Sequence, residues 1–202
     1  YATHSWGPYH WARTANPFTL KLGDNVTTAW DIYLAEASVG WSQSSVLDTT
    51  VVAGGTTPRK CVAATGRIEV CNAKYGNTGW LGLAQIWISG EHITRGVAKM
   101  NDTYFNTPTY NTPAWRRLVT CQEVAHTFGL AHQDEIFNNA NLGSCMDYTN
   151  DPDGPLSNER PNAHDYQQLE TIYAHLDSFA TSGAGASEGG PGKSGLADID
   201  VS

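Results

Sequence analysis

The chain has 202 residues, 40% of them hydrophobic, which is enough apolar material for one sizeable core. Its formal net charge of −8 argues against a nucleic acid or an anionic membrane as a partner. No apolar run in the sequence is long enough to cross a membrane. Charged residues make up only 16%, a composition typical of secreted proteins, and Tyr1 in place of methionine predicts a processed or trimmed chain.

Residues 1–17 are rich in aromatic side chains and predict an irregular arm over the body of the protein. We interpret its histidines, His4 and His10, as surface or packed residues; an inhibitory or ligand-supplying role is the alternative. Alternating residues over 18–22 predict a first strand. Aromatic and aliphatic residues at near-helical spacing predict a long helix over 27–42.

Short β-branched or apolar runs predict four further strands, at residues 49–53, 67–71, 83–88 and 96–100. His92, in the loop before the last of these, is expected to be solvated. A helix follows over 113–128, with Thr112 as its N-cap, Pro113 at its first position and Gly129 at its left-handed end.

A closing helix is predicted over 161–178, with Leu176 in its apolar stripe. The Gly, Ser, Ala and Asp composition after it predicts a flexible tail or linker. We therefore expect an arm at 1–17, one folded domain at 18–178 and a tail at 179–202.

The most informative stretch is the end of the helix over 113–128. Gln122 and His126 are one turn apart and share a helix face, and Glu123 flanks that face. The turn at Gly129 can return His132 toward the same point. Two ligands on a helix, a third after a glycine turn and an adjacent carboxylate are the layout of a zinc hydrolase.

This stretch resembles the metzincin metalloproteases, whose pattern is H-E-x-x-H-x-x-G-x-x-H followed by a Met-turn. Glu123, His126, Gly129 and His132 match the pattern, whereas Gln122 stands where the family has its first histidine. Residues 144–149 resemble the Met-turn. An ordinary amphipathic helix with one buried histidine is the alternative, but it would make the glycine and the Met-turn coincidences.

The resemblance implies a mixed α/β fold. A twisted, mostly parallel sheet with an antiparallel edge strand would pack on two long helices. An irregular lower part would carry the Met-turn and end in a C-terminal helix. Backbone groups of the edge strand, at Gln85, Ile86 and Trp87, would pair with an extended substrate, although a plain edge strand is equally compatible with the sequence.

The resemblance also implies the residue roles. Gln122, His126 and His132 would hold zinc, and Glu123 would be the general base and acid of peptide-bond hydrolysis. Met146 would underlie the metal, and Tyr148 would bind the resting metal or the oxyanion, a buried core tyrosine being the alternative. The expected protein is a secreted, monomeric zinc endopeptidase acting on a protein or peptide.

Gln122 leaves three outcomes open, because an amide oxygen is a weaker zinc donor than imidazole. Zinc binds with Gln122 or a water in the first position, or Asp134 or Tyr148 substitutes for it. Alternatively, the domain is a catalytically impaired pseudoprotease that binds proteins or peptides.

Calcium is a further candidate ion. The oxygen-rich stretch after His132 offers ligands, although its spacing matches no established calcium loop; they are Asp134, Glu135, Asn138, Asn139 and Asn141.

The four cysteines allow three pairings. The sequence-local choice pairs Cys61 with Cys71 and Cys121 with Cys145, and it implies an oxidising compartment. Free thiols or zinc-ligating thiolates are the alternatives, but the spacings do not match paired C-x-x-C ligands.

Overall fold

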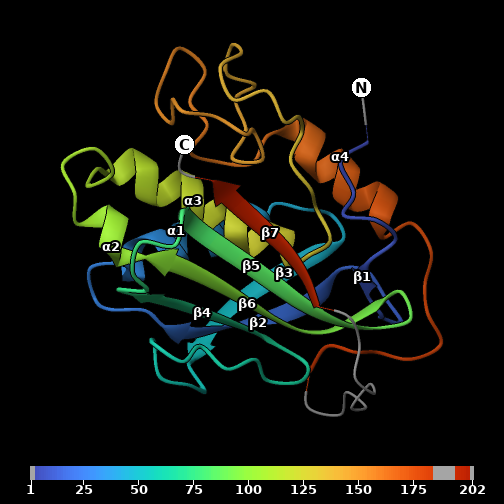
Figure 1. Ribbon diagram of the computed structural model, residues 1–202. Coiled ribbons are helices and arrows are strands. Elements are labelled where there is room, and N and C mark those ends of the chain that lie inside the picture. The colour runs from blue at the N-terminus through green and yellow to red at the C-terminus, as the bar shows by residue number, and fades with distance from the viewer. Residues whose placement is uncertain (1–2, 184–193, 201–202) are drawn as a thin grey trace.

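The computed structural model describes residues 3–183 and 194–200 and shows a twisted mixed sheet with helices packed on one face (Figure 1). The strands run in the order β3-β2-β4-β6-β5-β7. They comprise β2 (Phe18–Asn25), β3 (Leu47–Ala53), β4 (Ile68–Ala73), β5 (Trp80–Ser89), β6 (His92–Asn101) and β7 (Ser194–Asp200). A short strand, β1 (His10–Trp11), pairs with the start of β6 outside this order.

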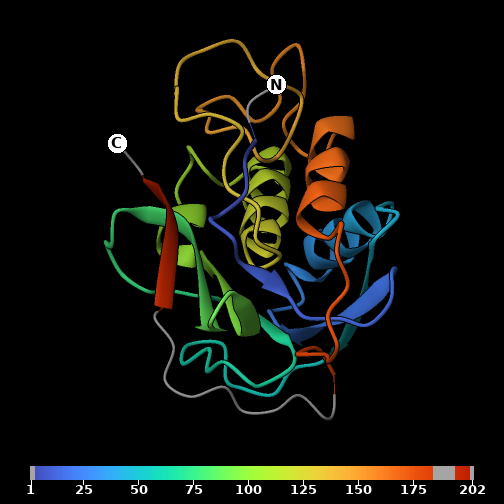
Figure 2. The same cartoon turned by 90° about the vertical axis from the view of Figure 1, so that its right-hand side faces the viewer.

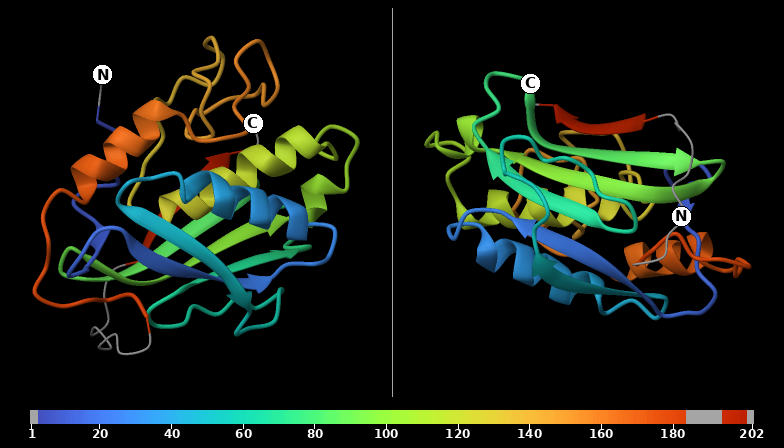
Figure 3. Two further views of the ribbon diagram at one scale, coloured as in Figure 1. Left: turned by 180° about the vertical axis from the view of Figure 1, so that it is seen from behind. Right: turned by 90° about the horizontal axis from the view of Figure 1, so that it is seen from below.

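The pairing confirms the mixed α/β fold and its mostly parallel sheet. β3, β2, β4 and β6 are parallel neighbours, whereas β5 runs antiparallel to β6. α1 (Asp31–Trp41) and α3 (Pro113–His126) lie side by side across the sheet (Figure 3). α4 (Ala163–Ile172) stands beside them (Figure 2), and α2 (Asp102–Phe105) is a single turn after β6.

Tryptophans join the helices and the sheet into one core. Trp11, Trp30 and Trp41 are almost completely buried. The indole of Trp41 donates to the carbonyl of Cys121 at 3.0 Å, which fixes α1 against the end of α3. Each such ring removes a large apolar area from water while keeping its N–H bonded.

α3 begins where its sequence predicts and ends at His126, two residues before the predicted end at 128. The Thr112 side chain accepts a hydrogen bond from the Trp115 amide, and Pro113 occupies the first turn, where its missing N–H has no cost. Gly129 has φ +97°, and a Cβ there would lie 2.1 Å from the Tyr9 carbonyl oxygen. Only glycine fits this turn, which reverses the chain after the helix.

Two helix boundaries differ from prediction by four residues or more. α1 begins at Asp31 rather than 27, because the Thr27 amide donates to the Asn72 side chain of β4. α4 ends at Ile172 rather than 178, because the buried Tyr173 hydroxyl donates to the Phe128 carbonyl at 2.7 Å and holds the chain there. The chain beyond then runs beside the arm, and Leu176, expected in the apolar stripe, is exposed.

The arm and the tail both contact the sheet. Ser5 forms a bridge with Leu130, and β1 pairs with β6. β7 falls within the range predicted as a flexible tail and runs antiparallel along β5 (Figure 1). The other residues of that tail beyond 183 lie outside the described residues.

The predicted disulfide pairing is confirmed. Cys61 is bonded to Cys71 of β4, and Cys121 of α3 is bonded to Cys145 in the segment between α3 and α4. Closing loops of this size typically stabilises a fold by about 2–4 kcal/mol. In the part of the chain that the structure describes, no helix combines the length and apolarity needed to span a bilayer.

Candidate metal centre

The last two turns of α3 bring the predicted site residues to the protein interior. Gln122, Glu123 and His126 are each no more than 1% exposed. Beyond Gly129, the Ala131 amide donates to the His4 carbonyl at 2.7 Å, so the arm holds the reversed chain in place. His132 follows directly and is returned toward α3, as the sequence predicts.

The two histidines of the motif meet through their Nε2 atoms, which are 3.2 Å apart. A tetrahedral zinc ion with bonds of about 2.0–2.1 Å holds its ligand atoms about 3.3 Å apart. The spacing of His126 and His132 therefore fits two ligands of one such ion.

The opposite ring nitrogens fix the tautomers of both histidines. His126 Nδ1 lies 2.8 Å from the Leu130 carbonyl oxygen, which can only accept, so Nδ1 carries the proton. His132 Nδ1 lies 3.1 Å from Glu135 Oε1, and the bond with His132 lowers the pKa of that carboxyl. With both Nδ1 atoms bonded to acceptors, the two Nε2 atoms are the ring nitrogens that face each other, as they would around a shared metal ion.

Burial and the neighbouring His132 lower the pKa of His126 to about 3. Near neutral pH this ring is therefore neutral, with a proton on Nδ1 and none on Nε2, which is the state that binds a metal.

The Gln122 amide is held by the turn that follows. Its Nε2 donates to the carbonyls of Cys145 and Asp147 at 2.8 and 3.1 Å. Both partners are acceptors, so the NH₂ group must face them. Its Oε1 is buried without a hydrogen-bond partner in the described structure and is the atom left for a ligand.

Gly82 of β5 is a site residue that the sequence analysis missed. A Cβ at this position would lie 2.5 Å from Cγ and Oε1 of Glu123 and 2.6 Å from Val119 Cγ1. The absent side chain lets the Glu123 carboxylate lie against the strand backbone. The signal was a glycine inside a strand, which often marks such a close approach.

Met146 and Tyr148 lie in the segment between α3 and α4. Met146 is fully buried, and its carbonyl accepts from the amide of Gln133, the residue after His132. The Tyr148 ring is tilted against the His132 ring, with 5.2 Å between centroids. The turn at Met146 is therefore joined to both parts of the motif, through Gln133 and through the Cys121–Cys145 disulfide.

The predicted substrate-binding residues lie in the middle of β5. Ile86 is buried, whereas Gln85 and Trp87 are half-buried. On one side they pair with β6, and on the other they pair with Leu196, Gly195 and Ser194 of β7. The edge of β5 is thus paired within this chain.

The stretch considered for calcium uses its polar groups internally. Asp134 accepts from the Ile136 amide and from the Asn139 side chain, and Asn141 donates to the carbonyls of Asp151 and Leu156. These contacts account for the stretch as a hydrogen-bonded loop, and calcium binding stays a prediction of the sequence alone.

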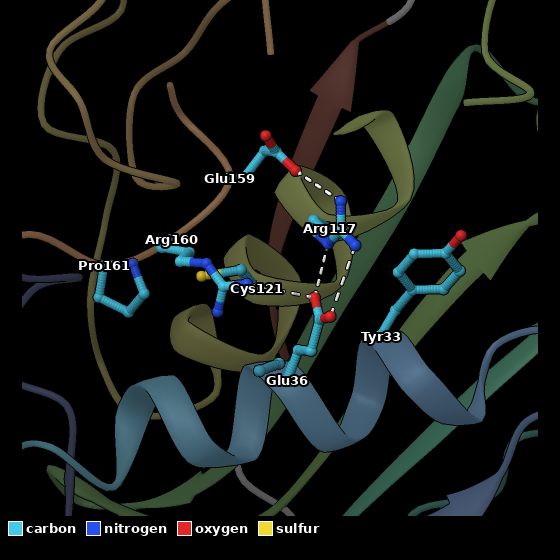
Figure 4. Close-up of a pocket in the computed structure, with 8 residues that line it drawn as sticks. Tyr33, Glu36, Arg117, Cys121, Glu159, Arg160 and Pro161 are labelled. Carbon is cyan, nitrogen blue, oxygen red and sulfur yellow. Dashed lines mark hydrogen bonds and ion pairs between the residues drawn. The ribbon is translucent and has the colours of Figure 1, made fainter. Parts of the chain in front are cut away.

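Two hollows lie near the site without containing its histidines. One, of about 610 Å³, is lined by residues including Gln133 and His164. The other lies behind α3, where Arg117 bonds Glu36 at 2.6 Å and Glu159 at 3.0 Å (Figure 4). These ion pairs raise the pKa of Arg117. They join α1 and α3 to the segment between α3 and α4, so we interpret this hollow as structural.

No family model and no curated protein matches the chain. Two solved structures of myroilysin are similar, at TM-scores of 0.46 and 0.43 and identities of 12% and 13%. Each covers 81% of this chain, and the matched parts are 96% and 86% of those chains.

Proposed function

We propose that the protein is a secreted, metzincin-like zinc endopeptidase. The observation that carries the proposal is the pair of Nε2 atoms of His126 and His132, 3.2 Å apart, beside a buried glutamate. The Q-E-x-x-H-x-x-G-x-x-H spacing supports the family resemblance. The two disulfides support an oxidising, extracellular compartment.

Gln122 Oε1, His126 Nε2 and His132 Nε2 would hold the metal. When bound, zinc supplies a Lewis acid that lowers the pKa of a water to about 7 and polarises a carbonyl. Leu130 O and Glu135 fix the two imidazoles, as partners of zinc-binding histidines commonly do. The Met146 segment fixes the Gln122 amide.

Glu123 is the proposed proton carrier. It would accept a proton from the attacking water and deliver it to the leaving amine, a role typically worth about 10²–10⁴ in rate. The glycine at position 82 leaves room for the carboxylate beside β5, where an extended peptide would bind. Tyr148, whose ring is tilted against the His132 ring, is the proposed partner of the developing oxyanion.

A catalytically impaired binding domain is the second candidate. Gln122 favours it, because an amide oxygen is a weak zinc donor. The pairing of β7 along β5 also favours it, because this strand occupies the edge that a substrate would use.

The test compares wild type with Glu123→Gln and with His126→Ala/His132→Ala. We expect Glu123→Gln to keep its zinc but lose at least about 10²-fold in peptide cleavage. The double histidine variant should lose the zinc ion at this centre, and it should also lose peptide cleavage. Zinc is measured by elemental analysis after dialysis, and cleavage with a quenched-fluorescent peptide library.

Zinc binding that the double histidine variant abolishes, without cleavage by the wild type, would favour the binding domain. If the double variant binds as much zinc as the wild type, His126 and His132 do not hold zinc, and both candidate functions lose their metal. A Gln133→Ala control, next to His132 but outside the ligand set, should keep its zinc.

A further inference from the structure

A second group of potential ligands lies where the arm meets the start of β6 and the segment after α4. We name His10, His92, His175 and Asp177 the histidine–aspartate cluster, and we propose that it is a structural zinc site. It shares no residue with the candidate metal centre. The ligand atoms of His10, His92 and Asp177 lie within 4.8 Å of one another.

The distances within the cluster are close to a tetrahedral edge. His92 Nε2 lies 3.2 Å from Asp177 Oδ1, and His10 Nε2 lies 3.7 Å from Asp177 Oδ2. His175 Nε2 lies 3.1 Å from His10 Nε2 and 3.7 Å from Asp177 Oδ1. Tetrahedral zinc separates its ligands by about 3.3 Å and prefers imidazole and carboxylate, so little movement is needed to close the site.

The surroundings orient two of the ligands. His10 Nδ1 lies 2.9 Å from the Pro8 carbonyl, so it donates there and presents Nε2 as an acceptor to the cluster. Asp177 Oδ2 accepts from Arg13 Nη1 at 3.0 Å, while Oδ1 faces His92 and His175. Hydrogen bonds of this kind commonly hold metal-binding histidines and carboxylates in place.

Backbone pairing brings the ligands together from distant parts of the chain. β1 and β6 place His10 directly opposite His92. The Asp177 amide donates to the Arg13 carbonyl at 2.9 Å, which fixes the segment after α4 beside the arm. A metal here would cross-link three segments, which is a structural role rather than a catalytic one.

The metal-free explanation is a polar network. In it, His175 donates to His10, His92 donates to Asp177, and the Arg13 guanidinium pairs with the carboxylate. A comparable group of His4, His164 and Asp165 does have such an explanation, because Asp165 already accepts from Ser144, Asn162 and Gln133. In the histidine–aspartate cluster the Nε2 atoms of His92 and His175 face Asp177 Oδ1, that of His10 faces Oδ2, and those of His10 and His175 face each other, which favours a metal.

The test counts zinc per chain in the full-length protein and in His126→Ala/His132→Ala, which lacks the candidate metal centre. The double variant should keep one zinc. Adding His92→Ala and His175→Ala should lower the affinity for that zinc ion by at least about 100-fold. Glu91→Ala, an exposed neighbour of His92, is the matched control and should keep it.

Cobalt(II) in place of zinc should give the absorption of a tetrahedral site, lost with the same two substitutions. If His126→Ala/His132→Ala does not fold, His92→Ala/His175→Ala in the wild type should lower the zinc count from two to one. An unchanged count there would overturn the proposal. A folded His126→Ala/His132→Ala protein that binds no zinc at a free zinc concentration of ~10 µM would also overturn it. One zinc in the wild type, kept in that variant, would support this site and reject the proposed function instead.

Discussion

The Gln122 amide has two roles. Its NH₂ group donates to the carbonyls of Cys145 and Asp147, and its oxygen remains for a ligand. Gln122→His would supply an imidazole, a better zinc donor. A neutral imidazole has a single N–H, so it cannot reproduce both bonds to the turn and must use its other nitrogen for the metal.

We therefore expect Gln122→His to bind zinc at least about 10-fold more tightly, on the scale of ligand-shell changes. We also expect the metal-free protein to lose about 1–3 kcal/mol of stability, because a buried carbonyl loses its partner. Competitive chelator titration measures the affinity, and urea unfolding with and without EDTA measures the stability.

Gln122→Ala is the control for this pair of effects. It removes both the oxygen and the amide, so it should weaken zinc binding and destabilise the protein as well. Zinc affinity equal to that of the wild type in Gln122→Ala would show that residue 122 does not ligate the metal, and the ligand set would then have to be redrawn.

At the residue scale, the sequence predicts contacts that arise locally. His126 and His132 are six residues apart, and one glycine turn brings them together, so spacing alone is sufficient to predict their meeting. Gly82 and Glu123 meet only through the packing of β5 on α3. His92, predicted to be solvated, contacts Asp177 because β1 and the segment after α4 converge on it.

At the element scale, β7 decides whether an extended peptide can reach β5. Its backbone pairs antiparallel with residues of β5 from Trp80 to Trp87. Deletion of residues 194–202 should therefore raise the affinity of the protein for extended peptides, because strand addition needs an unpaired edge. Fluorescence anisotropy with a labelled peptide measures this without requiring catalysis.

A synthetic peptide of residues 194–200 is the matching control. Added to the shortened protein, it should compete with the labelled peptide, whereas a peptide of the same composition in scrambled order should compete less. Equal peptide affinity in the full-length and shortened proteins would argue that binding occurs elsewhere.

Elements were predictable where local signals agreed. α3 has a threonine cap, a proline at its first position and a terminal glycine, and its bounds are close to prediction. β1 and α2 were not predicted, because two and four residues carry too little periodicity. α4 stops early because Tyr173 is held by the distant residue Phe128, which no local pattern reveals.

At the scale of the whole molecule, the parallel sheet order could not be derived from the strands alone. Strand composition predicts mixed α/β, but the order β3-β2-β4-β6-β5 depends on packing between distant segments. The family resemblance supplied the mostly parallel sheet and the antiparallel strand. The arm inserts Trp11 into the core, which composition alone did not predict.

The disulfides also bear on how the chain reaches this structure. The native pairs are 10 and 24 residues apart, whereas every bond of the two alternative pairings joins cysteines at least 50 residues apart. Loop-closure entropy favours each short loop by about 1 kcal/mol over its long alternatives. Oxidative refolding, followed by acid trapping and peptide mapping, should therefore show native pairs among the first intermediates; early accumulation of long-range pairs would contradict this. Chain connectivity itself thus biases oxidation toward the native bonds and reduces the need for later isomerisation.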